Sequence, residues 1–277
     1  MAQPIFTAEH FQNEEAAFAF LEERIWPDGP VCPHCGSLAA RIKKLGGKTT
    51  RVGLWKCYAC MKPFTVKVGT VFESSHVKLH LWLQAMHLMC SSKKGISSNQ
   101  LHRTLGVTLK TAWFMSHRIR EALTTVGAGP MGGEGAIVEI DETFIGRKEG
   151  VEQRRGFFHR RAVLTLVERG KGSCSFHVEG TSSAILLPII KANVSAASIV
   201  MTDEASYYSR LGQHFAGHDF TRHSAGEYVR DKVIHTNTVE GFYSVFKRGF
   251  KSTYQHCGEQ HLHRYIAEYD FRYTNRI

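Results

Sequence analysis

Four cysteines form two pairs with the spacing of a tetrahedral metal site. Cys32 and Cys35 make one C-x-x-C pair, Cys57 and Cys60 make the second, and 21 residues separate the pairs. Each pair directs two thiolates at one point from a tight turn, and two such turns enclose one zinc ion with Zn–S bonds of about 2.3 Å. The spacing therefore predicts a zinc ribbon. Two disulfides or two redox C-x-x-C motifs are disfavoured for a protein of a reducing compartment.

Two aspartates stand where predicted strands end. Asp141 follows a predicted strand over 136–140, and Asp203 follows another over 198–202. A carboxylate in this position is held by the strand and open at the edge of the sheet. Mg²⁺ is usually bound by one or two carboxylates together with substrate phosphate. Two such ions about 3.5–4 Å apart activate an attacking oxygen and stabilise the leaving one, so the pair predicts a two-metal site.

A third metal ligand is expected from the helix that begins near residue 237. Asn237 and Glu240 are three residues apart and share a helix face, and Lys247 lies two turns beyond Glu240. Lys247 together with Arg248 could bind phosphate. Glu240 is favoured as the ligand by strength, because a carboxylate binds Mg²⁺ better than an amide, while Asn237 is equally well placed. The pattern leaves both residues open.

The positive charge of the chain is concentrated in one part of it. The net charge is +10, and by segment it is −5 over residues 1–30, +13 over 31–127 and +2 over 128–277. A segment this basic, with only two acidic residues, indicates binding to a phosphate backbone. The charge therefore predicts a nucleic-acid partner, and the helix-turn-helix pattern described below favours double-stranded DNA.

The basic segment contains the ribbon, over 31–68, and a helical module, over 69–127. An amphipathic helix over 8–25 precedes them within an N-terminal segment of residues 1–30. In the helical module, a helix over 80–90 is followed by a short helix, a turn with Gly106 and a longer helix that begins at Thr108. This order is typical of a helix-turn-helix, although ordinary helical hairpins share it. The outward face of the last helix is expected to carry Lys110, His117, Arg118 and Arg120, and Trp82 and Trp113 are expected in the core.

A glycine-rich linker over 127–135 separates this module from a segment of different character. Over 136–277 we expect strands at 136–140, 161–167, 174–178 and 198–202, and helices at 183–193, 238–250 and 260–273. This order favours a mixed α/β sheet with helices on its faces. The sequence has no apolar run of about 18 residues that would span a membrane. It also has no basic and apolar leader, so a cytoplasmic protein is expected.

Taken together, these features resemble the zinc-ribbon DDE transposases of bacterial insertion sequences. The resemblance rests on the four cysteines, the helix-turn-helix pattern and the segments 138–146, 202–204 and 235–243, and it extends over about residues 10–277. It implies a ribonuclease-H-like catalytic domain over 136–277, Mg²⁺ or Mn²⁺ as catalytic cofactor, binding to terminal inverted repeats, and a homo-oligomer on DNA. Asp141 and Asp203 match the first two acids of the family, and Lys247 matches the basic residue. Members of the family use either Asn or Glu as third ligand, so Asn237 and Glu240 both remain candidates.

The chain departs from the family pattern at two places. Gly146-Arg147-Lys148-Glu149 stands where the family is commonly richer in glycine and lysine, and the sequence ends at Ile277 where a further tail is expected. The second departure gives an alternative hypothesis: an inactive, transposase-derived zinc-ribbon protein that binds DNA without catalysis. A metal-dependent nuclease without strand transfer is another alternative, because the same site performs hydrolysis and transesterification.

Overall fold

The chain folds into two compact units. The computed structural model describes residues 4–124, 129–153 and 155–276. One unit comprises Met1–Ser92 and Ile96–Ile119, and the other comprises Lys93–Gly95 and Arg120–Ile277. Positions 127 and 128 of the predicted linker lie outside the described residues. Among those that are described, every helix is too short or too polar to cross a bilayer.

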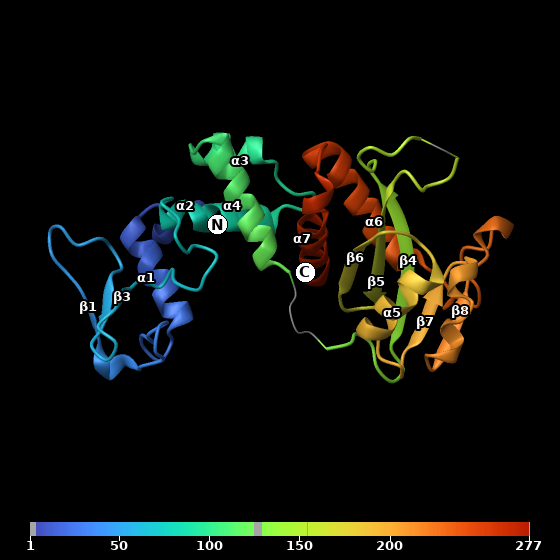
Figure 1. The fold of residues 1–277 in the computed structure, drawn as a ribbon, viewed down its shortest axis with the longest axis horizontal. Helices are drawn as coiled ribbons and strands as arrows, with labels where there is room; N and C mark the ends of the chain where they lie inside the picture. The colour runs from blue at the N-terminus through green and yellow to red at the C-terminus, as the bar shows by residue number, and fades with distance from the viewer. Residues whose placement is uncertain (1–3, 125–128, 154, 277) are drawn as a thin grey trace. The chain divides into compact units, whose positions relative to one another are not determined.

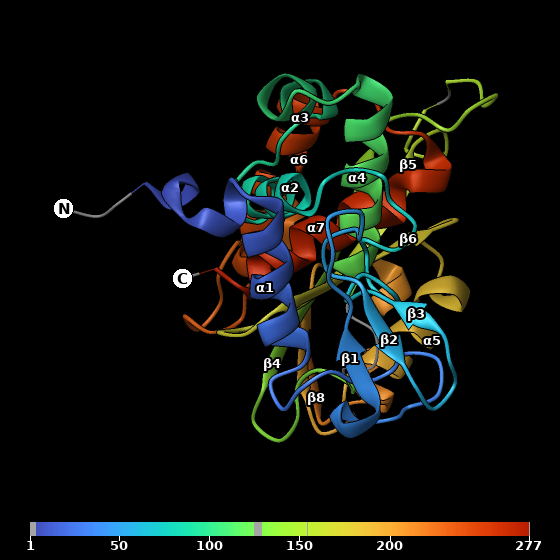
Figure 2. The same cartoon turned by 90° about the vertical axis from the view of Figure 1, so that its left-hand side faces the viewer.

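The first unit begins with a helix that packs on a small ribbon (Figure 2). The helix predicted over 8–25 starts later, as α1 (Glu14–Ile25), because the side chain of Asn13 accepts hydrogen bonds from the N–H groups of Glu15 and Ala16 and caps it. The ribbon consists of three antiparallel strands in the order β1-β2-β3, namely β1 (Ile42–Lys44), β2 (Trp55–Cys57) and β3 (Pro63–Phe64). Glu22 joins the two parts, since its carboxylate accepts from Trp55 Nε1 and Lys44 Nζ, each at 2.9 Å.

Three helices follow the ribbon: α2 (Leu79–Ser91), α3 (Ser98–Leu105) and α4 (Leu109–Ala122). Gly106 ends α3 in the left-handed conformation, at φ +66°, which glycine adopts without strain. Thr108 Oγ1 then accepts from the N–H of Thr111 at 3.2 Å and caps α4, as predicted. The predicted order of short helix, glycine turn and longer helix is therefore present.

The exposed face of α4 differs from the prediction. His117 and Arg120 are buried, not outward-facing. Arg120 is buried because its guanidinium donates to Glu268 at 2.7 Å, a partner far away in the sequence. Trp82 is fully buried as expected, but Trp113 is 41% exposed. The exposed residues of α4 include Lys110, Trp113 and Phe114, together with Leu109, Glu121 and Ala122.

The second unit is built on a five-stranded mixed sheet in the order β6-β5-β4-β7-β8 (Figure 1). Its strands are β4 (Ile137–Ile145), β5 (Arg161–Glu168), β6 (Ser173–Val178), β7 (Ile199–Thr202) and β8 (Gly217–Phe220). β5 runs antiparallel to its neighbours β4 and β6, whereas β4, β7 and β8 are parallel. β5, β6 and β7 match the predicted strands within one residue. β4 overlaps the predicted strand 136–140 but continues to Ile145 because residues 141–145 also pair with β5, so Asp141 lies within the strand and not after its end. β8 was not predicted.

Helices cover both faces of this sheet. α5 (Ser183–Asn193) packs on one face, where Leu186 and Ile190 join a core with Val138 and Ile140 of β4. α6 (Asn237–Gly249) and α7 (Leu262–Thr274) pack on the other face in a second core. Short turns of 3-10 or π helix complete the unit: Ser206–Tyr208, Leu211–Gln213, His223–Ala225, Phe250–Tyr254 and Glu259–His261. The central strand β4 therefore lies between two helical layers, although it contains three acidic residues, Glu139, Asp141 and Glu142.

Candidate functional site

Asp141 and Asp203 lie on adjacent parallel strands. In the pairing of β4 with β7, Ile137 stands opposite Ile199 and Glu139 opposite Met201. The same register, continued by two residues, places Asp141 beside Asp203, which directly follows the end of β7. Because neighbouring strands are about 4.8 Å apart, the two backbones are in reach of a common ligand.

The carboxyl group of Asp141 is in an environment that disfavours its charge. The pKa of Asp141 is raised to about 8, mainly by burial and in addition by the negative charges of Glu142, Asp203 and Glu240. A hydrogen bond from the N–H of Glu142 to Asp141 Oδ1, at 2.8 Å, opposes the shift. Such crowding of acids is the situation that a bound cation relieves.

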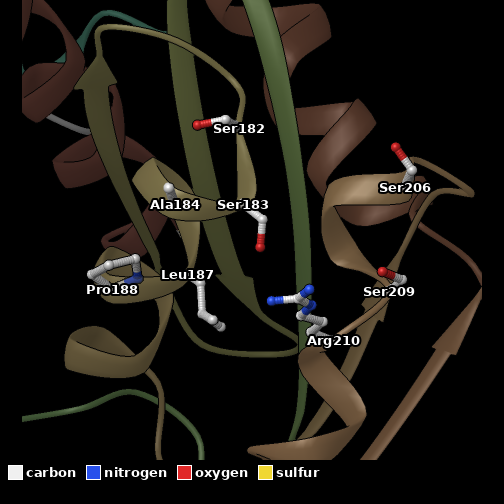
Figure 3. A pocket seen from close by; sticks show the side chains of 8 residues that line it. All are labelled: Ser182, Ser183, Ala184, Leu187, Pro188, Ser206, Ser209 and Arg210. Carbon is white, nitrogen blue, oxygen red and sulfur yellow. The ribbon is translucent and has the colours of Figure 1, made fainter.

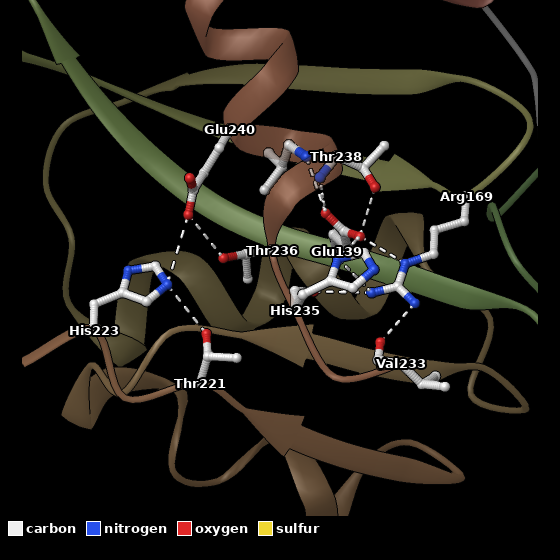
Figure 4. A network of polar contacts seen from close by, with 10 residues as sticks. Glu139, Arg169, Thr221, His223, Val233, His235, Thr236, Thr238 and Glu240 are labelled. Atoms are coloured by element: carbon white, nitrogen blue, oxygen red, sulfur yellow. Dashed lines mark hydrogen bonds and ion pairs between the residues drawn. The ribbon is translucent and has the colours of Figure 1, made fainter. Parts of the chain in front are cut away.

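The N-terminus of α6 is fixed to β4 by Glu139, two residues before Asp141 (Figure 4). Glu139 is fully buried. Its Oε2 accepts from the N–H groups of Thr238 and Val239 at 2.8 and 3.0 Å, and its Oε1 accepts from Thr238 Oγ1 at 2.7 Å. A carboxylate at a helix N-terminus satisfies free N–H groups and favours the helix dipole. Glu139 therefore sets the position of α6 relative to Asp141.

Arg169 completes this buried network. Its Nε donates to Glu139 Oε1 at 2.6 Å, and its other nitrogens donate to the carbonyl oxygens of Val233 and His235 at 2.8 and 2.9 Å. His235 Nδ1 lies 3.2 Å from Glu139 Oε1. The segment that leads into α6 is thus tied to the same carboxylate as the helix itself.

The three predicted residues of α6 differ in their surroundings. Glu240 Oε1 accepts from Thr236 Oγ1 at 3.2 Å and lies 3.6 Å from His223 Nε2. Asn237, the first residue of α6, is exposed. Lys247 is also exposed, and its Nζ lies 5.7 Å from the centre of the Tyr243 ring. Of the two candidate third ligands, Glu240 has the charge that acts on Asp141.

Two tyrosines link the segment after Asp203 to β4. Tyr208 Oη donates to Glu142 Oε2 at 2.7 Å, and Tyr207 Oη donates to Glu142 Oε1. Burial is the main cause that raises the pKa of Glu142 and of both tyrosines. Asp203 Oδ1 accepts from the N–H of Ala205 at 3.0 Å, which orders the start of this segment. Sequence reasoning missed the role of Glu142, because its partners lie far along the chain.

Tyr243 connects the centre of α6 to the same strand. Its hydroxyl donates to the carbonyl oxygen of Asp141 at 2.6 Å. The side chain is buried in the core between α6 and the sheet. The backbone of Asp141 is therefore held from the α6 side as well as by its neighbouring strands.

The four predicted cysteines meet in the first unit. The Sγ atoms of Cys32 and Cys60 are 3.7 Å apart, as are those of Cys35 and Cys57. A tetrahedron with Zn–S bonds of about 2.3 Å has S–S edges of roughly 3.8 Å, so the cluster fits structural zinc. Among the described residues, this is the only group of three or more Cys, His, Asp or Glu whose ligand atoms all lie within 4.8 Å of one another. The carboxylates around Asp141 are accordingly less tightly grouped than the thiolates.

A pocket of about 590 Å³ lies between α5 and the segment 206–210 (Figure 3). Arg210 extends toward α5, and the lining includes the following residues: Ser182, Ser183, Ala184, Leu187, Pro188, Ser206 and Ser209. Over the part of the chain that is described, its lining contains no carboxylate. Hydroxyl and guanidinium groups can hydrogen-bond an anion, but they are not a site for a divalent cation.

Two family models match the chain. The model of the ISXO2-like transposase domain matches residues 132–274, and that of the transposase zinc-ribbon domain matches residues 12–63. A protein of Halobacterium salinarum described as an uncharacterized protein in transposable element ISH50 is 27% identical over 282 residues, which cover 95% of this chain and 91% of the relative. The first match contains Asp141, Asp203 and Glu240, and the second contains all four cysteines of the cluster.

Proposed function

Because the chain belongs to the family of ISXO2-like transposase domains, we propose that it is the DNA transposase of an insertion sequence, cleaving and joining DNA strands by two-metal-ion phosphoryl transfer. The observation that supports the proposal is the parallel pairing of β4 with β7, whose register, continued by two residues, brings Asp141 opposite Asp203 just after β7 ends. The mixed sheet with helices on both faces agrees with a ribonuclease-H-like catalytic domain.

In this proposal Asp141, Asp203 and a residue of α6 hold Mg²⁺ or Mn²⁺. The ions would activate the attacking oxygen and neutralise charge on the phosphate. The protein positions these ligands through groups already described. Tyr243 holds the backbone of Asp141, and Glu139 holds the first turn of α6. Lys247, exposed on α6, would contact a phosphate oxygen of the DNA.

We assign the third ligand to Glu240 in preference to Asn237. The charge of Glu240 contributes to the raised pKa of Asp141, which supports a place within the same group of acids. His223, 3.6 Å from Glu240, orients its carboxylate. A carboxylate is also the stronger ligand for a hard cation.

The first unit supplies the DNA-binding function in this proposal. The zinc ribbon and the helices α3 and α4, as a helix-turn-helix, would bind the terminal inverted repeats of the element. The support is the net charge of +13 over residues 31–127 and the exposed face of α4 with Lys110, Trp113 and Phe114. Two or more protomers would bridge two element ends in the cytoplasm.

The test is a cleavage and joining assay on a labelled duplex that carries the element's own ends. We expect strand cleavage with Mg²⁺ or Mn²⁺, none with EDTA, and joined products when target DNA is added. Asp141→Ala and Asp203→Ala should abolish both products while end binding persists. If either variant cuts as well as the wild type, the assignment of the metal site is wrong. Cleavage without joined products would identify a nuclease instead.

A further inference from the structure

The hairpin that joins β4 to β5 exposes an aromatic side chain on a rigid base. Phe158 is 85% exposed and Phe157 is 54% exposed. Both rings follow Gly156, which turns the chain at φ +83°. Exposed phenyl rings are available for a contact with a partner, and the groups around them indicate what that partner would be.

The base of the hairpin is ordered by contacts within it. The Phe157 ring stacks on Phe144 of β4, with ring centres 4.5 Å apart and planes 11° from parallel. The N–H of Lys148 donates to the carbonyl of His159 at 2.8 Å, and the N–H of Arg160 donates to the carbonyl of Phe157 at 2.9 Å. These contacts order the backbone on either side of Phe158.

The surroundings of Phe158 are basic. Arg147, Arg155 and Arg160 are exposed in the same hairpin, and the Arg160 guanidinium lies 5.7 Å from the centre of the Phe157 ring. Arginine beside an exposed aromatic ring is a combination that binds nucleic acid by phosphate contact and base stacking.

The hairpin continues the strand that carries Asp141. Phe144, on which Phe157 stacks, is three residues further along β4, about 10 Å at 3.4 Å per residue. One DNA strand rises about 3.4 Å per nucleotide, so this distance is roughly three base steps. The Phe144 ring packs on the α5 side of the sheet, so a DNA strand that enters the carboxylate site would reach the hairpin by continuing past the end of β4.

We propose that Phe158 stacks against a DNA base a few nucleotides from the reacting phosphate, and that Arg147, Arg155 and Arg160 hold the backbone beside it. The inference rests on the proposed function, since it assigns a second contact to the same DNA. Such a ring inserted at a base step would open the duplex next to the cleavage site, where the scissile strand must leave the helix to reach the carboxylates.

The test uses the full-length protein with Ca²⁺ in place of Mg²⁺, and end duplexes with 2-aminopurine at successive positions around the cleavage site. Wild-type protein should raise the fluorescence at one or two adjacent positions. Phe158→Ala should remove that signal and weaken end binding roughly tenfold to a hundredfold. Phe158→Trp should keep the signal. Val151→Ala, which removes another exposed apolar group of the hairpin, should bind within about twofold of wild type.

Two results would overturn the inference. One is a Phe158→Ala protein with wild-type fluorescence and affinity. The other is loss of self-association of Phe158→Ala without DNA, measured by native mass spectrometry, which would identify a second copy of the chain as the partner. Asp141→Asn separates this inference from the proposed function. It should keep the fluorescence signal and lose cleavage, so cleavage by that variant would refute only the metal site.

Discussion

Asp141 comes opposite Asp203 when the parallel register of β4 and β7, which pairs Glu139 with Met201, is continued by two residues. The two residues come from distant parts of the chain, and the sheet alone brings them together. Burial and neighbouring acids raise the pKa of Asp141 to about 8. A protein that retains such a costly group has a use for it, and the stability of the metal-free protein should reveal the cost.

Asp141→Asn is expected to abolish cleavage and to stabilise the metal-free protein at high pH. An aspartate whose pKa is raised on folding contributes stability at low pH, and this contribution is lost as pH rises through the folded pKa of about 8. The amide carries no charge, so at pH 9 in EDTA the variant should melt a few degrees above wild type. At pH 4, near the ordinary pKa of 3.8, the two should melt nearly alike, and the difference should grow between pH 4 and pH 8. Thermal unfolding at both pH values is the measurement, and a less stable variant at pH 9 would contradict the electrostatic account.

The choice of third ligand predicts unequal effects of two changes in α6. Glu240→Gln should lower Mg²⁺-dependent cleavage by roughly a hundredfold or more, because it removes a ligand charge from a site that must bind divalent ions. Asn237→Ala, at an exposed position, should cost less than about tenfold. Cleavage rates measured across a Mn²⁺ titration test this. The reverse order of effects would assign the site to Asn237.

The anchoring of α6 predicts a loss of both stability and turnover when Glu139 is removed. Glu139→Ala leaves two helix N–H groups and Nε of Arg169 without their acceptor, and it removes the negative charge that pairs with the guanidinium. Removing one partner of a buried ion pair costs about 3–5 kcal/mol. We expect a lower free energy of unfolding, measured in urea, and a lower cleavage rate at unchanged affinity for end DNA.

Lys171→Ala is the matched control for Glu139→Ala. Lys171 pairs with Glu168 at 2.6 Å, but its side chain is 69% exposed. An exposed ion pair contributes about 0–1 kcal/mol. The control should therefore unfold and cleave like wild type, and an equal effect of both changes would argue against a specific role of the buried network.

The cysteine cluster predicts that each chain binds one zinc ion and that DNA binding is lost when the zinc is lost. Cys57→Ser deletes one of four ligands, and small zinc sites do not stay folded without metal. The variant should release its zinc and lose affinity for end DNA, as judged by metal analysis and gel shift. Cys174→Ser, a change in β6 of the other unit, should keep one zinc. A Cys57→Ser protein with full zinc content would exclude the cluster as the site.

The elements of this fold were largely predictable, and the contacts between distant elements were not. In the sequence, Asp141 and Asp203 each follow a short apolar run, and such runs can be recognised as strands from the sequence alone. β8 was missed because Gly217–Phe220 is a half-buried edge strand that contains His218 and Asp219, and it has no apolar run. This segment is a strand because it pairs with β7, and that pairing is a tertiary contact which the local sequence does not indicate.

The polar network of the site was the part that local patterns could not predict. Glu139 and Glu142 both lie in β4 and look like ordinary polar positions of a strand. Their partners, among them Arg169, Thr238 and Tyr208, lie 30 to 99 positions away. The same reason applies to Arg120, which was expected to face solvent and is instead buried against Glu268. Sequence spacing identifies which residues could act, while the sheet and α6 determine which of them meet.

The buried position of Asp270 predicts that the free energy of unfolding decreases as pH rises from mildly acidic to neutral. Its carboxylate in α7 accepts from Ser173 Oγ, Ser175 Oγ and the N–H of Ser175 at 2.7–2.8 Å. Burial nevertheless raises its pKa to about 6 from 3.8. The folded state therefore binds a proton more tightly than the unfolded state, and the stabilisation present near pH 4 is lost as pH rises through about 6. Between pH 4 and pH 7 the titration of Asp270 should lower the free energy of unfolding by about 2 kcal/mol.

Asp270→Asn keeps the shape of the side chain but does not titrate. The difference in free energy of unfolding between the two proteins should therefore change by this amount between the two pH values. Urea unfolding at the two pH values measures it, and a constant difference would show that Asp270 stays charged throughout.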